Sequence, residues 1–120
     1  MSHIVSVATK VRDPVAIAAA CQRLGLAAPV HGTAKLFSGQ VSGLLVQLPG
    51  WRYAVAIDTD ARAVQFDNFN EHWGKQVELD RFLQAYAVET AKLEARKKGY
   101  SVTEQPLHDG SIRVQITTNQ

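Results

Sequence analysis

The sequence has very little cysteine and no long apolar run. Its 120 residues include one cysteine, Cys21, which excludes an internal disulfide and a zinc site built on paired cysteines. No N-terminal stretch has the composition of a secretory signal, and no apolar stretch approaches the about 20 residues that cross a membrane. We therefore expect a single domain, 1–120, in the cytoplasm, with no membrane partner.

Excess charge of either sign is also small. The chain has thirteen Lys and Arg residues and eleven Asp and Glu residues, which gives a net charge of +2. This charge is too small to indicate a nucleic-acid-binding protein. The basic run at 95–98 could join Lys10, Arg12, Lys35 and Arg52 in a nucleic-acid patch. Its place at the end of an expected helix explains the run without a ligand, because cations stabilise that end of the helix dipole.

Recognisable catalytic motifs are missing as well. The chain has no phosphate-loop lysine signature and no G-x-S-x-G around Ser38 or Ser42. Four histidines, at positions 3, 31, 72 and 108, are scattered without a His-x-x-x-His pair. The sequence therefore predicts no catalytic residue, no metal and no cofactor, and it favours a protein that is not an enzyme.

The first half of the chain predicts one helix among short strands. Residues 4–11 alternate as a strand, with Val5, Val7, Thr9 and Val11 on one face. Asp13 and Pro14 are typical of a helix start, and Gly25 of a helix end. The buried stripe of this helix is expected to comprise Ile17, Ala20, Cys21 and Leu24. Strands follow at 30–37 and 40–50, where Pro49-Gly50 marks a turn, and a hairpin follows at 53–67.

The second half predicts a long helix and a final hairpin. A helix is predicted at residues 77–98, because they carry an apolar stripe, with acidic residues in the first turn and basic residues in the last. The stripe comprises Leu79, Phe82, Leu83, Tyr86, Thr90 and Leu93. Strands at 100–107 and 111–118 flank a turn, and Ile112, Val114 and Ile116 are expected to return to the core. The predicted fold is an α+β two-layer sandwich. It has a mainly antiparallel sheet with two helices on one face, in the order β-α-β-β-β-β-α-β-β.

The stretch "DNFNEHWGK" at 67–75 is the richest polar and aromatic cluster. One interpretation is a binding loop, in which the tryptophan supplies a rigid contact and its polar neighbours supply specificity. The other is a turn whose Phe69 and Trp73 fold back over the end of the core. The candidate interaction surface comprises His3, Asn68, Asn70, His72, Trp73 and Lys75.

Two other clusters suggest chemistry but have simpler explanations. His108, Asp109 and Ser111 stand together, yet Asp109-Gly110 is a strong turn pair, and a tight hairpin specifies no base–nucleophile geometry. Asp58 and Asp60, with Asp67 farther along, could hold a hard cation. No calcium-loop spacing is present, so "DTDA" at 58–61 is interpreted as a hairpin turn.

The two ends of the chain resemble a known family. The segments "MSHIVSVATKVRD", "FLQAYAVETAKLEARKKGYSV" and "EQPLHDGSIRV" resemble the small family first named from hypothetical chloroplast open reading frame 35, also called domain of unknown function 1257. The matching positions are Ser2, His3, Arg12, Asp13, Phe82, Leu83, Tyr86, Ala87, Lys98, Gly99 and 109–113.

This resemblance implies a partner rather than a reaction. The family has no established activity, and its genes are often found beside AAA-type ATPases, so the resemblance implies an adaptor that works with such an ATPase. One alternative is a small-molecule-binding domain or small enzyme with a site near 67–75. A second is nucleic-acid binding, which the charge disfavours. An exposed sheet edge would also allow a homo-oligomer.

Overall fold

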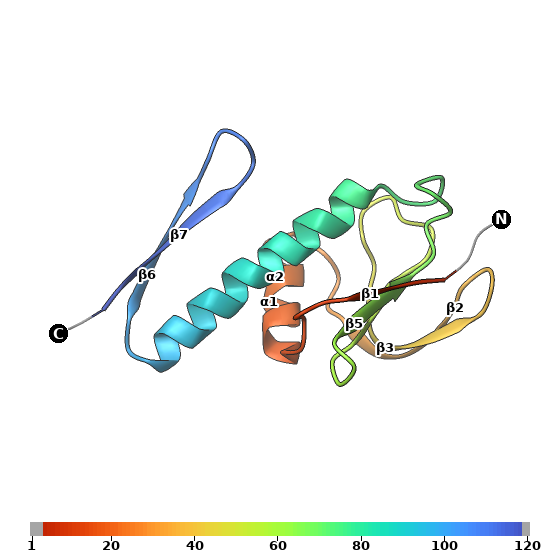
Figure 1. Cartoon of the computed structure of the whole chain (residues 1–120), viewed down its shortest axis with the longest axis horizontal. Helices are drawn as coiled ribbons and strands as arrows, with labels where there is room; N and C mark the ends of the chain where they lie inside the picture. Colours follow the sequence, from red (N-terminus) through yellow and green to blue (C-terminus); the bar gives the residue numbers. More distant parts are fainter. Residues whose placement is uncertain (1–3, 119–120) are drawn as a thin grey trace.

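The computed structural model describes residues 4–118 of the chain. Two helices and seven strands follow one another in the predicted order (Figure 1). They are β1 (Val5–Ala8), α1 (Pro14–Arg23), β2 (Val30–Lys35), β3 (Gln40–Val46), β4 (Val55–Asp58), β5 (Ala63–Phe66), α2 (Gln76–Lys97), β6 (Ser101–Pro106) and β7 (Ile112–Thr117).

Five strands form one antiparallel sheet, in the order β1-β5-β4-β3-β2. Both helices pack on the same side of it, and one hydrophobic cluster joins Ile17 of α1, Phe82 of α2 and Ile57 of β4. The α+β fold with two helices on one face of an antiparallel sheet is therefore confirmed. In the described part of the chain, no helix is long and apolar enough to cross a membrane.

Local chemistry sets the ends of α1 as the sequence predicts. The Asp13 carboxylate accepts a hydrogen bond from the Val15 N–H at 2.9 Å, and Pro14 occupies the first turn. At the other end, Gly25 adopts a positive φ of 71°. The Leu26 N–H then donates to the Cys21 carbonyl at 2.8 Å, which closes the helix.

The first strand is shorter than predicted. Pairing with β5 ends at Ala8, and residues 9–13 run on without regular structure. Val7 is 45% exposed, whereas Val11 is buried. These two side chains therefore do not share one face of a strand, as the sequence predicts. The reason is tertiary: the hydroxyl of Tyr86 in α2 accepts hydrogen bonds from the backbone N–H groups of Arg12 and Asp13, at 3.0 and 3.1 Å. These bonds tie the connecting segment to the helix.

The long helix α2 has two packed faces rather than the one predicted. Leu79, Phe82 and Tyr86 of the predicted stripe are buried against α1 and the sheet, while Leu83, Thr90 and Leu93 are half-buried. Val88 and Ala95 are also buried, on the side of the helix that carries Lys92. That second side faces the final hairpin, because Lys92 forms an ion pair with Glu104 of β6.

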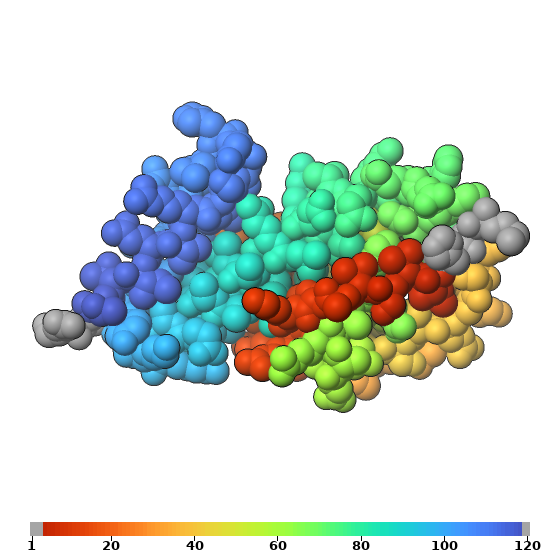
Figure 2. All heavy atoms as spheres, in the orientation of Figure 1, coloured from red at the N-terminus to blue at the C-terminus, as the bar shows by residue number. Residues whose placement is uncertain are grey.

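The final hairpin is a separate two-stranded sheet, which corrects one expectation. Within residues 4–118, β6 pairs only with β7. α2 lies between this hairpin and the larger sheet (Figure 1). Ile112 and Val114 are half-buried and Ile116 is 45% exposed, so the expected return of these side chains to the core is wrong. Figure 2 shows the hairpin forming one end of the molecule. The radius of gyration is accordingly 15.4 Å, against about 13.6 Å for a compact chain of this length.

Candidate functional site

The loop between β5 and α2 is closed by its own hydrogen bonds. The Asp67 carboxylate accepts from the Phe69 N–H at 3.1 Å, and the Trp73 N–H donates to the Asn68 carbonyl at 3.0 Å. The Asn68 side-chain amide donates to the Gly74 carbonyl at 3.1 Å. Asp67 and Asn68 are only 2% and 7% exposed. These two side chains therefore hold the loop together from inside, and Asn68 is not part of its outer surface.

The tip of this loop has an uncommon backbone conformation. Three consecutive residues other than glycine, Phe69, Asn70 and Glu71, have positive φ angles of 46°, 50° and 72°. Each such residue costs on the order of 1–3 kcal/mol, and the surrounding structure must hold it in place. Part of that support comes from α2, because the Glu71 carboxylate accepts from the Gln76 N–H at 3.0 Å. The loop therefore has one specified shape.

A buried tryptophan supports the other end of the loop. Trp51 is 5% exposed, and its indole N–H donates to the Lys75 carbonyl at 3.0 Å. Its ring also meets the ring of Phe66 edge to face, with centroids 5.6 Å apart. Gly74 lies so close to this ring that an added Cβ would be 2.4 Å from it. The end of the loop is thus fixed directly on the core.

An aromatic cluster lies above this frame, and we term it the aromatic surface: Phe37, Arg52, Tyr53, Phe69 and Trp73. Trp73 is its centre, with ring centroids 5.5, 5.6 and 4.8 Å from those of Phe37, Tyr53 and Phe69. The guanidinium of Arg52 lies 4.9 Å from the Trp73 ring centre and 5.5 Å from that of Tyr53, within cation–π distance. Phe37 is 68% exposed. The aromatic surface therefore combines a preorganised centre with an exposed edge.

The 67–75 stretch has an exposed part and a part that folds back on the core. Asn70, His72 and Lys75 are exposed, as a binding loop requires, and the His72 ring meets that of Phe69 with centroids 5.0 Å apart. Trp73 is half-buried, partly folded back as the alternative predicted. His3 lies outside the described residues.

The sequence does not predict three members of the aromatic surface. It predicts strands at the positions of Phe37 and Tyr53, and it offers Arg52 only for a basic patch. Phe37 lies two residues after the end of β2, in the bend before Gly39. A large aromatic residue in a hairpin turn is the local signal of an exposed ring. For Arg52 and Tyr53 no local signal exists, because their partners come from the distant loop.

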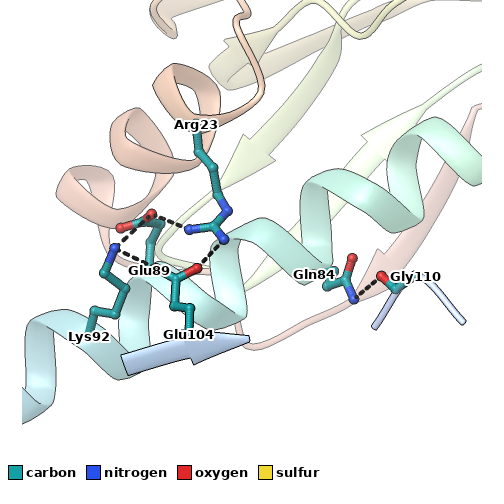
Figure 3. A network of polar contacts seen from close by, with 6 residues as sticks. All are labelled: Arg23, Gln84, Glu89, Lys92, Glu104 and Gly110. Carbon is teal, nitrogen blue, oxygen red and sulfur yellow. Dashed lines mark hydrogen bonds and ion pairs between the residues drawn. The ribbon is translucent and has the colours of Figure 1, made fainter. Parts of the chain in front are cut away.

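The tetrapeptide at 108–111 forms a turn, as predicted. The Asp109 carboxylate accepts from both the N–H and the hydroxyl of Ser111, at 2.9 and 2.5 Å. These hydrogen bonds, that from the Ser111 side chain most of all, lower the pKa of Asp109. Gly110 has a φ of 87°, and its carbonyl accepts from the Gln84 amide at 3.1 Å (Figure 3). All of these polar groups maintain the turn.

Four charged side chains connect α1, α2 and β6 (Figure 3). Arg23 of α1 lies 3.1 Å from Glu89 of α2 and also pairs with Glu104 of β6. Lys92 of α2 lies 2.8 Å from Glu104 and 3.7 Å from Glu89. Hydrogen bonds from Arg23, and next from Lys92, lower the pKa of Glu104 from 4.5 to about 2. Glu104 therefore anchors the final hairpin to both helices.

Glu104 is expected to make stability depend on acid pH. Because its pKa is lower in the folded chain than in the unfolded chain, its contribution is complete above pH 4.5 and is lost as pH falls toward 2. We expect Glu104→Gln to lower the free energy of unfolding at neutral pH by about 1 kcal/mol. Urea unfolding across this pH range should show the deficit disappear in acid. A deficit that is equal at both ends of the range would contradict the ion-pair role.

The remaining candidates for chemistry have structural roles. Cys21 is fully buried, and burial raises the pKa of its thiol, so it is a poor nucleophile. The Asp58 carboxylate accepts from the N–H groups of Asp60 and Ala61, at 3.1 and 3.0 Å, as in a hairpin turn. Among residues 4–118, no group of three His, Cys, Asp or Glu side chains is placed to hold a metal ion.

Comparison of the chain with protein-family models, with curated proteins and with solved structures gave no match. The likeness to the chloroplast open-reading-frame family therefore stays a prediction from the residues that carry it. Three of the matching positions lie together in the structure, since the Tyr86 hydroxyl accepts hydrogen bonds from the backbone N–H groups of Arg12 and Asp13.

Proposed function

We propose that this protein is a non-catalytic interaction module that binds another protein through its aromatic surface. The observation that carries the proposal is the exposure of Phe37. It is the most exposed large apolar side chain among residues 4–118, at 68%, and its ring contacts the fixed ring of Trp73. An aromatic side chain held in place while exposed to water supplies contact area with little loss of entropy on binding.

The composition of the aromatic surface fits a protein partner. Aromatic residues and arginine are enriched at protein interfaces and dominate their hot spots. The loop conformation at Phe69, Asn70 and Glu71 supports the same conclusion, because strain of this kind persists at binding sites. Hydrogen bonds to Trp51 and to the start of α2 fix the geometry of this loop. A partner therefore does not have to order the loop when it binds.

Charge indicates the chemistry of the partner. Arg52 lies over the Trp73 ring. His72 and Lys75, which flank Trp73 in the sequence, are exposed. Such a surface complements an apolar patch that carries acidic side chains. The family resemblance adds an AAA-type ATPase as the expected partner.

Photo-crosslinking from two matched positions tests the proposal. Phe37→p-benzoylphenylalanine places the probe on the aromatic surface, and Val15→p-benzoylphenylalanine places it on α1, at a residue that is 64% exposed. In the native cells, position 37 should crosslink one discrete protein and position 15 should not. A product at twice the mass of the chain would identify that partner as a second copy.

Other products would contradict the proposal. Crosslinks from position 37 to nucleic acid would favour a stacking surface for bases. Equal products from positions 37 and 15 would mean that the aromatic surface has no special affinity. Crosslinks to no macromolecule at all would favour the small-molecule alternative near 67–75.

A further inference from the structure

A groove lies between the segment that follows β1 and one face of α2. Figure 2 shows the end of β1 between α2 and the turn that joins β4 to β5. The groove contains two cavities of about 750 and about 500 Å³. They adjoin, because Lys10, Tyr86 and Thr90 line both. Both volumes are typical of small-molecule sites.

The smaller cavity is mainly apolar. Its walls include four apolar side chains: Val11, Leu83, Ala87 and Ala91. The alanines of α2 leave this space open, since a larger residue at either position would fill it. A short hydrocarbon chain or a ring is the natural occupant of such walls.

The larger cavity is bordered by cations. Four cations come from three segments of the chain: Lys10 and Arg12 from the segment after β1, Arg62 from the turn before β5, and Lys97 from the end of α2. Lys97 pairs with Glu94 at 3.7 Å. Within residues 4–118, the side chains of the other three have no acidic partner within ion-pair distance. Three unneutralised cations around one cavity favour an anion.

The two acidic side chains of this cavity are already engaged. Asp13 caps α1 through the Val15 N–H, and Glu94 pairs with Lys97. Four cations and two acids leave a net charge of +2 around the cavity, so the acids reduce the positive field without cancelling it.

Two buried hydroxyl groups in this groove lack an acceptor. The Tyr86 oxygen accepts from the N–H groups of Arg12 and Asp13, but within residues 4–118 its own proton has no acceptor. The Tyr86 side chain is buried at 6% exposure. One turn farther along α2, the buried Thr90 hydroxyl has no hydrogen-bond partner in the same part of the chain. Buried donors without partners are costly, and a ligand oxygen would satisfy them.

We propose that this groove binds a small amphipathic oxyanion, a phosphate or carboxylate head on a short apolar body. Lys10, Arg12 and Arg62 hold the head, and Tyr86 and Thr90 donate hydrogen bonds to it. The apolar body enters the smaller cavity. This site lies on other residues than the aromatic surface and does not depend on the proposed protein partner.

Octyl phosphate, kept below its micelle concentration, is a suitable probe. Titration into ¹⁵N-labelled protein should shift the amide signals of residues 9–13 and 83–91. Arg62→Gln should weaken binding about tenfold, since it removes a charge-assisted hydrogen bond. Arg96→Gln is the matched control, because Arg96 is an exposed cation of α2 that does not line either cavity. Thr90→Val should also weaken binding while leaving the melting temperature unchanged or higher.

Three further ligands define the outcome. Inorganic phosphate should bind more weakly than octyl phosphate, and octyl glucoside should not bind; equal affinity of either would overturn the proposal. Phosphatidylcholine vesicles with and without phosphatidic acid distinguish a lipid headgroup from a free anion. Tighter, Arg62-dependent binding to the acidic vesicles would assign the anion to a lipid, whereas binding of the monomer alone would assign it to a soluble compound. Octyl phosphate binding that Arg62→Gln and Arg96→Gln affect equally would refute the site.

Discussion

Gly74→Ala is expected to lower the free energy of unfolding by about 2–3 kcal/mol, the upper part of the range for overpacked sites. An added Cβ would lie 2.4 to 2.6 Å from three atoms of the Trp51 ring. That ring cannot simply move aside, because its indole N–H binds the Lys75 carbonyl and its edge packs on Phe66. Relief therefore requires that the whole end of the loop lift off the core.

Gly32→Ala provides a matched control for this prediction. Gly32 lies in β2, where an added Cβ would make an ordinary contact of 3.9 Å with Leu45. We expect its free energy of unfolding to stay within about 0.5 kcal/mol of the wild type. Urea unfolding of both variants gives the comparison. If Gly74→Ala proves as stable as Gly32→Ala, the loop is not fixed on Trp51 in the way that the structure shows.

The parts of the fold that depend on local chemistry were predictable from sequence. Asp13-Pro14 and Gly25 bound α1 as expected, since a cap, a first-turn proline and a positive φ need only neighbouring residues. The Asp109-Gly110 turn is of the same kind. The order of helices and strands followed from these signals together with apolar periodicity.

The parts that depend on distant residues were not predictable. The final hairpin alternates apolar and polar residues just as a core strand does. Its separation from the main sheet depends on the second face of α2, seen in the burial of Val88 and Ala95. Its anchor, the pair between Arg23 and Glu104, joins residues 81 positions apart. No periodicity within one segment contains that information.

The candidate site shows the same division. The 67–75 stretch was recognisable because its polar and aromatic residues are contiguous. The aromatic surface also requires Phe37 and Arg52, which are distant from this stretch in sequence and meet Trp73 only in the folded chain. Asn68 was misassigned to the surface because sequence cannot tell an amide that closes a loop from one that faces a partner.

Trp73→Ala is expected to weaken binding of the crosslinked protein partner at least about 30-fold, the effect typical of an interface hot spot. Trp73 is the ring that Phe37, Tyr53 and Phe69 all contact, and Arg52 lies over it. Its removal takes away the largest contact and also releases Phe37 and Arg52 from their positions. Calorimetric titration of the purified partner measures the change.

The most direct test of the aromatic surface is the same titration with Phe37→Ala, because that ring is 68% exposed and contributes little to folding. Val15→Ala, which shortens an exposed apolar side chain on α1, is its control. We expect Phe37→Ala to weaken partner binding at least about tenfold while its free energy of unfolding stays within about 0.5 kcal/mol of the wild type. Val15→Ala should bind like the wild type. Wild-type affinity in both Phe37→Ala and Trp73→Ala would show that the partner binds elsewhere.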